Sequence, residues 1–368
     1  NIGGDVNWVA GLYYLNEEVP SHQEAYADDF LQYVGNPISF LRTIDDDLET
    51  TSFAVFGQID WLFAENWNLG IGLRWTTEEK DYFRTTSTFS DLLGVADPAF
   101  EFTDSDSWDD WTPTITLDWQ MNDAVRWYGR LAKGFKSGGF NGRANCAADV
   151  STFDPETVWT AELGAKTVMA GGRLIANYAL FYSKYDDFQA RVSVGEGIDF
   201  RFPVLNAAEL DIRGAEAELT WFPVDPLALF TQIGYLKSEY GAGGFFGADG
   251  IEDEPAFSPK WTARLGGTWT HELANNSQLL FTLAGNYRDA MWLSVENKPA
   301  LTEGDYWVVD AIVSWVSKGG NWTVRGGVKN LTDEVYRVEG QEFSSVGGIQ
   351  TAYYGNPRTY TISLDYRY

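Results

Sequence analysis

Residues 131–143, "LAKGFKSGGFNGR", place four glycines beside Lys133 and Lys136. Glycine-rich loops that contain a lysine can hold phosphate, because their backbone N–H groups turn toward the anion. That chemistry needs the spacing GxxxxGK[ST] and a helix that begins at the loop. Here the spacing is missing, and the stretch follows a strand-like segment of alternating residues. The sequence therefore disfavours a phosphate-binding loop.

Two acidic runs could supply oxygen ligands, "DDD" at 45–47 and "DSDSWDD" at 104–110. Neither places the glycine and the glutamate of an EF-hand loop, so we expect solvated loops rather than calcium sites. His22 and His271 are the only histidines and Cys146 is the only cysteine, which leaves no zinc cluster and no disulfide within the chain. No Ser/His/Asp or paired-carboxylate pattern stands out among the 53 acids. We predict no catalytic site, no metal site and no cofactor.

Composition limits the class of protein that could carry these residues. The 368 residues include 16 Trp, 19 Tyr and 23 Phe, yet no stretch approaches the roughly 18 apolar residues of a membrane-spanning helix. The net charge of −27 repels phosphate backbones, which argues against nucleic acid as a partner. The opening "NIGGDVNWVAGLYY" reads as a strand rather than as a signal peptide, so we expect a start that is processed or incomplete.

Apolar and polar residues alternate from one end of the chain to the other. In "WNLGIGLRW", residues 67–75, Trp, Leu and Ile occupy the odd positions, and Asn, Gly and Arg occupy the even ones. A period of two indicates β-strands, and helical periodicity is absent from these segments. We predict about fourteen strands, near residues 5–15, 50–63, 67–83, 108–120, 124–138, 154–170, 172–191, 202–221, 227–240, 258–271, 277–291, 305–317, 321–330 and 357–368.

The connections between these strands alternate between short and long. The short ones are rich in turn-forming residues and lie at 64–66, 121–123, 170–172, 223–226, 272–276 and 318–320. The long ones lie near 16–49, 84–107, 139–153, 192–201, 241–257, 292–304 and 331–356. Short turns at one end and long loops at the other are typical of outer-membrane barrels, whose long loops face outside. Four of the long loops hold 22 of the 53 acids and 3 of the 26 bases, so we expect the outer mouth to be acidic.

Four predicted strands carry two tryptophans eight residues apart on one face. Such a span covers about 26 Å of strand, or roughly 20 Å of membrane depth after tilting, which matches an apolar band between two aromatic girdles. The predicted girdle residues are Trp67, Trp75, Trp111, Trp119, Trp261, Trp269, Trp307 and Trp315. The opposite face is polar, as a barrel lumen requires, and includes Thr112, Thr114, Thr116, Asp118, Lys260, Thr262, Arg264, Thr268, Arg325 and Lys329.

The alternation changes phase within "LDIRGAEAELTW", residues 210–221. Leu210 and Ile212 fall on even positions, whereas the apolar residues after Gly214 fall on odd ones. We therefore expect a bulge or kink at Gly214.

Five stretches, taken in this order and spacing, carry a family signature. They are "FAVFGQIDWLFAENWNLGIGLRWTTEEKDY" (53–82), "WYGRLAKGFKSGGFNGR" (127–143), "FDPETVWTAELGAKT" (153–167), "NAAELDIRGAEAEL" (206–219) and "VKNLTDEVY" (328–336), followed by an aromatic C-terminus. Together they resemble the barrel of TonB-dependent outer-membrane receptors of Gram-negative bacteria. The resemblance implies a transmembrane barrel of about 22 strands, plugged by an N-terminal globular domain. It also implies uptake of a scarce small molecule, such as a ferric siderophore, haem, cobalamin or a saccharide, energised by the inner-membrane TonB complex.

The chain departs from that family in one respect, because we find neither a plug nor a TonB-contacting segment. Counting back from Tyr368, the strand at 5–15 would be about the ninth of a 22-stranded barrel. We therefore expect residues 1–368 to form the C-terminal part of the barrel domain, with the plug and about eight N-terminal strands outside the chain. Contact with the TonB complex would run through that missing plug.

Ligand contacts are expected from aromatic and basic residues in the long loops and near their bases. Aromatic rings would stack on a sugar or chelate and bases would meet anionic groups, although packing in a girdle or loop is an alternative role for each. The candidates are Lys136, Phe140, Arg143, Arg288, Trp292, Tyr306 and Tyr336. The last strand also resembles the signal read by the barrel-assembly machinery, at Leu364, Tyr366 and Tyr368. Outer-membrane lipid and lipopolysaccharide are the remaining expected partners.

Two other classes of function stay open on the sequence alone. A fourteen-stranded barrel could close on itself as a passive porin-like channel, and a barrel whose loops bind another protein need not transport anything. The last strand, "RTYTISLDYRY" at 358–368, separates the channel from the receptor. If it pairs with residues 5–15, the barrel is closed and the channel is favoured; if it does not, its partner strand is expected upstream.

Overall fold

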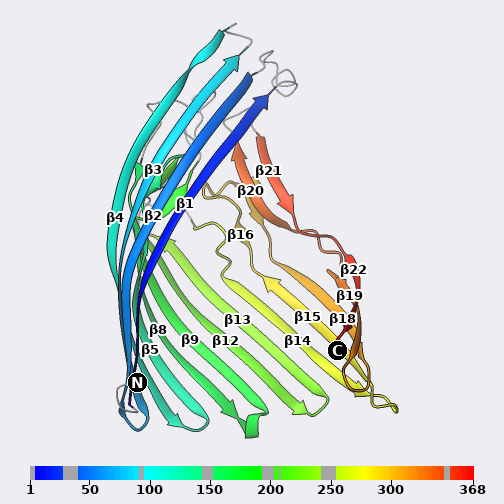
Figure 1. The fold of residues 1–368 in the computed structure, drawn as a ribbon. Helices are drawn as coiled ribbons and strands as arrows, with labels where there is room; N and C mark the ends of the chain where they lie inside the picture. The colour runs from blue at the N-terminus through cyan, green and yellow to red at the C-terminus, as the bar shows by residue number, and fades with distance from the viewer. Residues whose placement is uncertain are drawn as a thin grey trace.

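The computed structural model describes residues 5–27, 40–90, 95–142, 152–192, 203–206, 209–241, 254–343 and 349–368. They form one antiparallel sheet of fourteen strands that follow each other in chain order and curve like part of a barrel (Figure 1). The strands are β1 (Val6–Ala27), β2 (Phe40–Ala64), β3 (Trp67–Ser90), β4 (Val95–Asn122), β5 (Val125–Lys136), β8 (Glu156–Met169), β9 (Leu174–Asp186), β12 (Leu210–Val224), β13 (Leu227–Tyr240), β14 (Trp261–Glu272), β15 (Gln278–Arg288), β18 (Tyr306–Val316), β19 (Trp322–Lys329) and β22 (Thr359–Tyr366). The antiparallel all-β fold predicted from the alternation is confirmed.

Smaller elements lie within the connections. They are the pairs β6 (Gly139–Phe140) with β7 (Thr152–Phe153), β10 (Gln189–Arg191) with β11 (Val204–Asn206), β16 (Met291–Trp292) with β17 (Thr302–Glu303) and β20 (Arg337–Phe343) with β21 (Ile349–Tyr354), and the 3₁₀ helices η2 (Ala170–Gly172) and η4 (Pro299–Leu301). Within the described ranges, no helix has the length and apolar character needed to cross a membrane.

The short connections lie together at one end of the sheet, the lower end in Figure 1. Gly171 and Gly172 have φ of 66° and 87°, and Gly319 and Gly320 have φ of 85° and 78°. Glycine adopts this left-handed backbone without steric cost, which explains why "AGG" and "KGG" make the turns.

The prediction of long loops at 16–49 and 84–107 is largely wrong. β1 and β2 pair continuously from Val6 with Trp61 to Ala27 with Phe40, and β3 and β4 remain paired as far as Ser90 with Val95. Figure 1 shows these four strands reaching beyond the others at the end opposite to the short turns. The acidic run at 45–47 that suggested a loop instead lies within β2, where consecutive residues alternate between the two faces and Asp46 pairs with Arg84.

The bulge predicted at Gly214 is also wrong. β12 pairs in unbroken register with both β9 and β13 over residues 210–221. Gly214 has a different role, since a Cβ there would lie 2.5 Å from the carbonyl oxygen of Tyr235 and against the ring of Phe181. The apolar phase changes because the strand continues past the apolar band, where outward side chains such as Arg213 are exposed to water.

Gly214→Ala is therefore expected to destabilise the folded protein by about 1–3 kcal/mol, because the new methyl group meets backbone that cannot move aside. Gly326→Ala is the matched control, since Gly326 lies in β19 with nothing within 4 Å of the Cβ position. Urea unfolding of the two variants in lipid vesicles measures the difference. Equal midpoints for both variants would refute the close-packing role of Gly214.

The two faces of the sheet differ in chemistry, because residues directly opposite on paired strands share a face. One face exposes apolar side chains in the middle of the strands, including Leu12 (74% exposed), Leu283 (55%) and Ile362 (83%). The other face carries mostly polar side chains, such as Thr114, Thr262, Arg264 and Ser363, placed there by the register. Among the described residues, buried apolar side chains form one cluster, Met291, Leu293 and Leu301. The sheet is thus arranged with its apolar side outward, as in a membrane barrel.

The sheet ends at β1 on one side and at β22 on the other. Within the described residues β22 pairs with β19 alone, and no β1–β22 pairing is present. Every residue from Thr359 to Tyr366 is exposed. An unpaired edge in lipid leaves backbone N–H and C=O groups without partners, so each edge requires a pairing strand in a membrane.

Candidate functional site

An open cavity of about 670 Å³ lies on the polar face of the sheet. Its lining comes from β12, β13, β14, β15, β18 and β20 and from the segment just before β20. The lining residues are Glu216, Ala217, Glu218, Gln232, Ile233, Gly234, Thr262, Ala263, Arg264, Asn286, Tyr287, Arg288, Tyr306, Val308, Tyr336 and Val338. The strand register places four polar residues side by side across β12 to β15. Glu218 lies opposite Gln232, Gln232 lies opposite Arg264, and Arg264 lies opposite Asn286.

The cavity has a negative wall and a positive wall. Glu216 and Glu218 project from β12, while Arg264 and Arg288 project from β14 and β15. Arg264 lies over the Phe230 ring at 5.5 Å and donates a long hydrogen bond of 3.4 Å to Asn286 Oδ1. Within the described residues, neither arginine has a carboxylate oxygen within 4.0 Å, so both can still pair with an anionic group.

An aromatic pair forms one side of the cavity. The rings of Tyr306 and Tyr336 stack with centroids 4.7 Å apart and planes 22° apart. Tyr306 is buried, and Tyr336 is half-buried, so the pair is held by packing rather than free to rotate. Such a pair offers a flat apolar surface beside Arg288.

The motif "KNLTDEVY" positions Tyr336. Asn330, 2% exposed with φ of 52°, donates from Nδ2 to the carbonyl oxygens of Glu334 (2.8 Å) and Asn356 (3.1 Å). Its Oδ1 accepts from the backbone N–H of Glu334 at 2.8 Å, and its own backbone N–H donates to Asp310 Oδ1 at 3.0 Å. This buried asparagine fixes the turn that returns the chain to the cavity at Tyr336.

Arg337 links the cavity to the elements above it. Its Nε donates to Glu303 Oε2 at 2.7 Å, and its Nη1 donates to the carbonyl oxygen of Ala300 at 2.9 Å. β20 is thereby tied to η4 and β17. The predicted contact Trp292 lies in the neighbouring β16, opposite Thr302, and does not line the cavity.

The other predicted contacts lie far along the sheet from this cavity. Lys136 ends β5 opposite Glu156, and Phe140 stacks on Tyr82 with centroids 5.3 Å apart. Arg143 lies outside the described residues. Arg288, Tyr306 and Tyr336 are thus brought together, whereas Phe140 belongs to a separate cluster at β3 and Lys136 is exposed at the end of β5.

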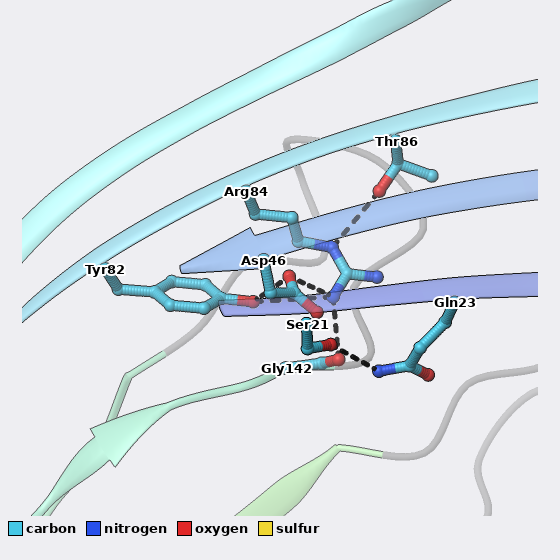
Figure 2. A network of polar contacts seen from close by, with 7 residues as sticks. All are labelled: Ser21, Gln23, Asp46, Tyr82, Arg84, Thr86 and Gly142. Atoms are coloured by element: carbon cyan, nitrogen blue, oxygen red, sulfur yellow. Dashed lines mark hydrogen bonds and ion pairs between the residues drawn. The ribbon is translucent and has the colours of Figure 1, made fainter. Parts of the chain in front are cut away.

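That second cluster centres on a buried arginine, drawn in Figure 2. Arg84 is 0% exposed and donates from Nη1 to Asp46 Oδ1 (2.9 Å) and to the carbonyl oxygen of Gly142 (2.7 Å). Its Nε donates to Thr86 Oγ1 at 3.1 Å, and the Tyr82 hydroxyl donates to Asp46 Oδ1 at 2.7 Å. The buried charge is therefore both paired and hydrogen-bonded.

Burial raises the pKa of Tyr82 to about 12, while the hydrogen bond from Arg84 acts in the opposite direction. The Tyr82 hydroxyl therefore stays protonated at neutral pH and remains a donor to Asp46. His22 lies farther out on β1, where its ring accepts or donates a 2.6 Å hydrogen bond with Asp45 that raises its pKa. His22 and His271 are both exposed.

The eight predicted girdle tryptophans lie on the apolar face. Six are near strand ends, whereas Trp75 and Trp111 lie within the long strands β3 and β4. Trp67 lies opposite Trp119 with rings stacked 5.3 Å apart, and Trp75 lies opposite Trp111 at 6.4 Å. Trp261 packs on Tyr235, and Trp307 on Tyr287. Trp269 lies opposite Phe281, and Trp315 opposite Leu279. At the chain end Tyr366 contacts Trp322 and Tyr368, and Leu364 lies opposite Val324.

Sequence reasoning did not single out Glu216 and Glu218 as ligand contacts, nor Lys80 and Arg84 as structural residues. Position parity could have placed all four on the lumen face. Which of them meet requires the register between strands, because Arg84 and Gly142 are 58 residues apart. The described ranges also contain no group of three or more His, Cys, Asp or Glu residues arranged to hold a metal ion.

Comparison with known proteins gives a consistent result. A family model described as "TonB dependent receptor-like, beta-barrel" matches residues 1–331. The ferric yersiniabactin uptake receptor FyuA from Yersinia pestis aligns over 98% of this chain and 51% of its own, with 19% identity and a TM-score of 0.77. The siderophore receptor PiuA from Acinetobacter baumannii aligns over 100% and 54%, with 17% identity and a TM-score of 0.73. The copper transporter OprC aligns over 97% and 57%, with 13% identity and a TM-score of 0.63. The chain spans about half the length of these structures.

Proposed function

This chain belongs to the TonB-dependent receptor-like β-barrel family, and on that premise we propose that it is the C-terminal part of a receptor barrel that imports a scarce chelate. The family comprises non-enzymatic transporters of the outer membrane of Gram-negative bacteria. The proposed ligand is a ferric siderophore or a similar metal chelate. The observation that carries this choice is the cavity at Arg288. There Arg264 and Arg288, which have no carboxylate partner among the described residues, lie beside the stacked rings of Tyr306 and Tyr336.

The proposed architecture places further strands and a plug upstream of Asn1. The two free edges, β1 and β22, support this division, because each would otherwise leave a row of backbone groups unsatisfied in lipid. The coverage of about half of FyuA and PiuA supports it independently. Energy coupling through TonB is then a property of the whole receptor, reached through the plug.

The proposed ligand class follows from the chemistry of the cavity. A chelate with aromatic or other flat groups would stack against Tyr306 and Tyr336, and its anionic oxygens would accept hydrogen bonds from Arg264 and Arg288. Glu216 and Glu218 on the opposite wall would favour a ligand that also carries a cationic or donor group. FyuA is described as a ferric yersiniabactin uptake receptor, PiuA as a siderophore receptor and OprC as a copper transporter, so chelated iron is proposed ahead of copper.

We further propose the roles of the outward and terminal residues. The eight tryptophans would anchor the barrel at the two membrane interfaces, in contact with outer-membrane lipid and lipopolysaccharide. Leu364, Tyr366 and Tyr368 would be read by the barrel-assembly machinery. A passive channel formed by these fourteen strands is disfavoured by the absence of β1–β22 pairing among the described residues.

Uptake by the full receptor should depend on the cavity residues. Arg288→Ala and Tyr336→Ala are each expected to lower uptake of the cognate chelate by about tenfold, because a charge-assisted hydrogen bond or a stacking surface is lost. The measurement is accumulation of radioactive iron from ferric citrate, a ferric catecholate and a ferric hydroxamate in a strain without other iron receptors. Arg325→Ala is the control, because Arg325 is paired with Asp365 near the short-turn end of the sheet. Unchanged uptake in both cavity variants would refute this site.

A further inference from the structure

Three residues at alternate positions of β3 hold one short segment of the chain. Lys80, Tyr82 and Arg84 share the lumen face of β3, because side chains two apart on a strand point the same way. They contact residues at 138, 140 and 142 respectively, within the segment 137–142 that follows β5. Every second residue of β3 from Lys80 to Arg84 therefore contacts every second residue of the segment from Gly138 to Gly142.

Lys80 holds the start of the segment. Its Nζ donates to Ser137 Oγ and to the carbonyl oxygen of Gly138, both at 2.8 Å, and pairs with Glu78 Oε1 at 3.1 Å. The Ser137 hydroxyl donates in turn to Glu78. Lys80 and Glu78 are mostly buried, with side chains 17% and 22% exposed, so these bonds are shielded from water.

Tight packing reinforces the same position. A Cβ on Gly138 would lie 2.7 Å from Nε1 of Trp108, which leaves no space for a side chain between the segment and β4. Across the segment, Gln189 Nε2 donates to the carbonyl oxygens of Ser137 (2.9 Å) and Asp154 (3.0 Å). The segment is therefore tied both to the β3–β4 wall and to β10.

The middle and the end of the segment are held by the buried cluster of Figure 2. The Phe140 ring lies nearly parallel to that of Tyr82, with planes 14° apart. Arg84 reaches the carbonyl oxygen of Gly142 while it remains paired with Asp46, whose side chain is 11% exposed. Releasing Gly142 would leave a fully buried guanidinium short of one acceptor, which is costly.

We propose that segment 137–142 is a fixed inner wall of the outer mouth, and that Lys80 and Arg84 are the positioning residues that keep it there. The Phe140 ring then stacks on Tyr82, so its face is not available to a ligand. The wall excludes a ligand from the space beside β3 and β5, which leaves the part of the lumen where Arg264 and Arg288 lie. That the segment is held in place follows from the contacts given above. Its effect on ligand passage rests on the proposed uptake function.

Hydrogen exchange tests the pinning without any ligand. In the full receptor in lipid nanodiscs, amides of 137–142 should exchange slowly, and Lys80→Met should speed them by about tenfold or more. Lys80→Arg, which keeps the charge and the donors, should restore slow exchange, and Lys133→Met should leave it unchanged because Lys133 pairs with Asp110. Exchange in the parent as fast as in Lys80→Met would overturn the pinning.

A tether tests whether the wall stays fixed during passage. Tyr82→Cys and Phe140→Cys, in a Cys146→Ser background, are joined by a short cleavable bifunctional maleimide. We expect the tethered receptor to take up the three ferric chelates at the same rate as the untethered receptor. A block that is relieved when the tether is cleaved would overturn the fixed wall. If the untethered parent imports none of the chelates, the proposed function fails, while the exchange result still decides the pinning.

Discussion

Leu283→Arg is expected to destabilise the folded receptor in lipid by about 2–4 kcal/mol, because it places a charge near the middle of the bilayer. Leu283 lies midway along β15 on the apolar face, where it is 55% exposed in the protein alone. It lies opposite Gly267 and Ala311 on the neighbouring strands, so neither directly opposite residue can pair with the new arginine. The shift in urea midpoint on unfolding from lipid vesicles measures the effect.

Thr282→Arg is the matched control for this prediction. Thr282 is the preceding residue, and its hydroxyl bonds that of Thr268 at 2.9 Å on the polar face. An arginine there can reach water in the lumen, so the expected cost is the loss of one hydrogen bond, about 1 kcal/mol. A larger cost for Thr282→Arg than for Leu283→Arg would mean that the two faces are assigned the wrong way round.

Arg84→Met is expected to cost about 3–5 kcal/mol, because it leaves the buried carboxylate of Asp46 without its positive partner. The Arg84 side chain is 0% exposed and that of Asp46 11%, so solvent cannot replace the lost interaction. Thermal unfolding of the receptor in detergent micelles, followed by tryptophan fluorescence, measures this loss.

Arg358→Met is the exposed counterpart. Arg358 and Asp333 pair at 3.1 Å with side chains 38% and 49% exposed, so breaking this pair should cost at most about 1 kcal/mol. In the double variant Arg84→Met/Asp46→Leu both buried charges are gone, and much of the lost stability should return. Equal losses for Arg84→Met and Arg358→Met would contradict the account of a buried, paired charge.

The fold followed from the sequence where local pattern determines structure. Alternation around Trp67 and Trp75 gave the strand and its two faces, and glycines such as Gly171 and Gly319 gave the turns, since both depend on neighbouring residues alone. The long extensions of β1 to β4 were missed because acidic runs such as 45–47 resemble loops in composition. Their strand pairing depends on partners about 40 residues away, such as Asp46 with Arg84.

The candidate site was predictable in part for the same reason. Residue type and position near loop bases indicate Arg288, Tyr306 and Tyr336, and the register of β15 and β18 together with Asn330 brings them into one cavity. The same reasoning indicates Phe140, yet its ring stacks on that of Tyr82. Composition indicates that an aromatic side chain is available, whereas tertiary contacts decide whether its face is free.

We propose that this barrel belongs to a receptor whose import is driven from the inner membrane. The most direct test measures radioactive iron uptake by the full receptor from the chelate it accepts, in otherwise identical cells with and without TonB. We expect that removal of TonB abolishes accumulation of iron while surface binding of the chelate remains. Uptake that continues at the same rate without TonB would contradict it and would favour a passive channel.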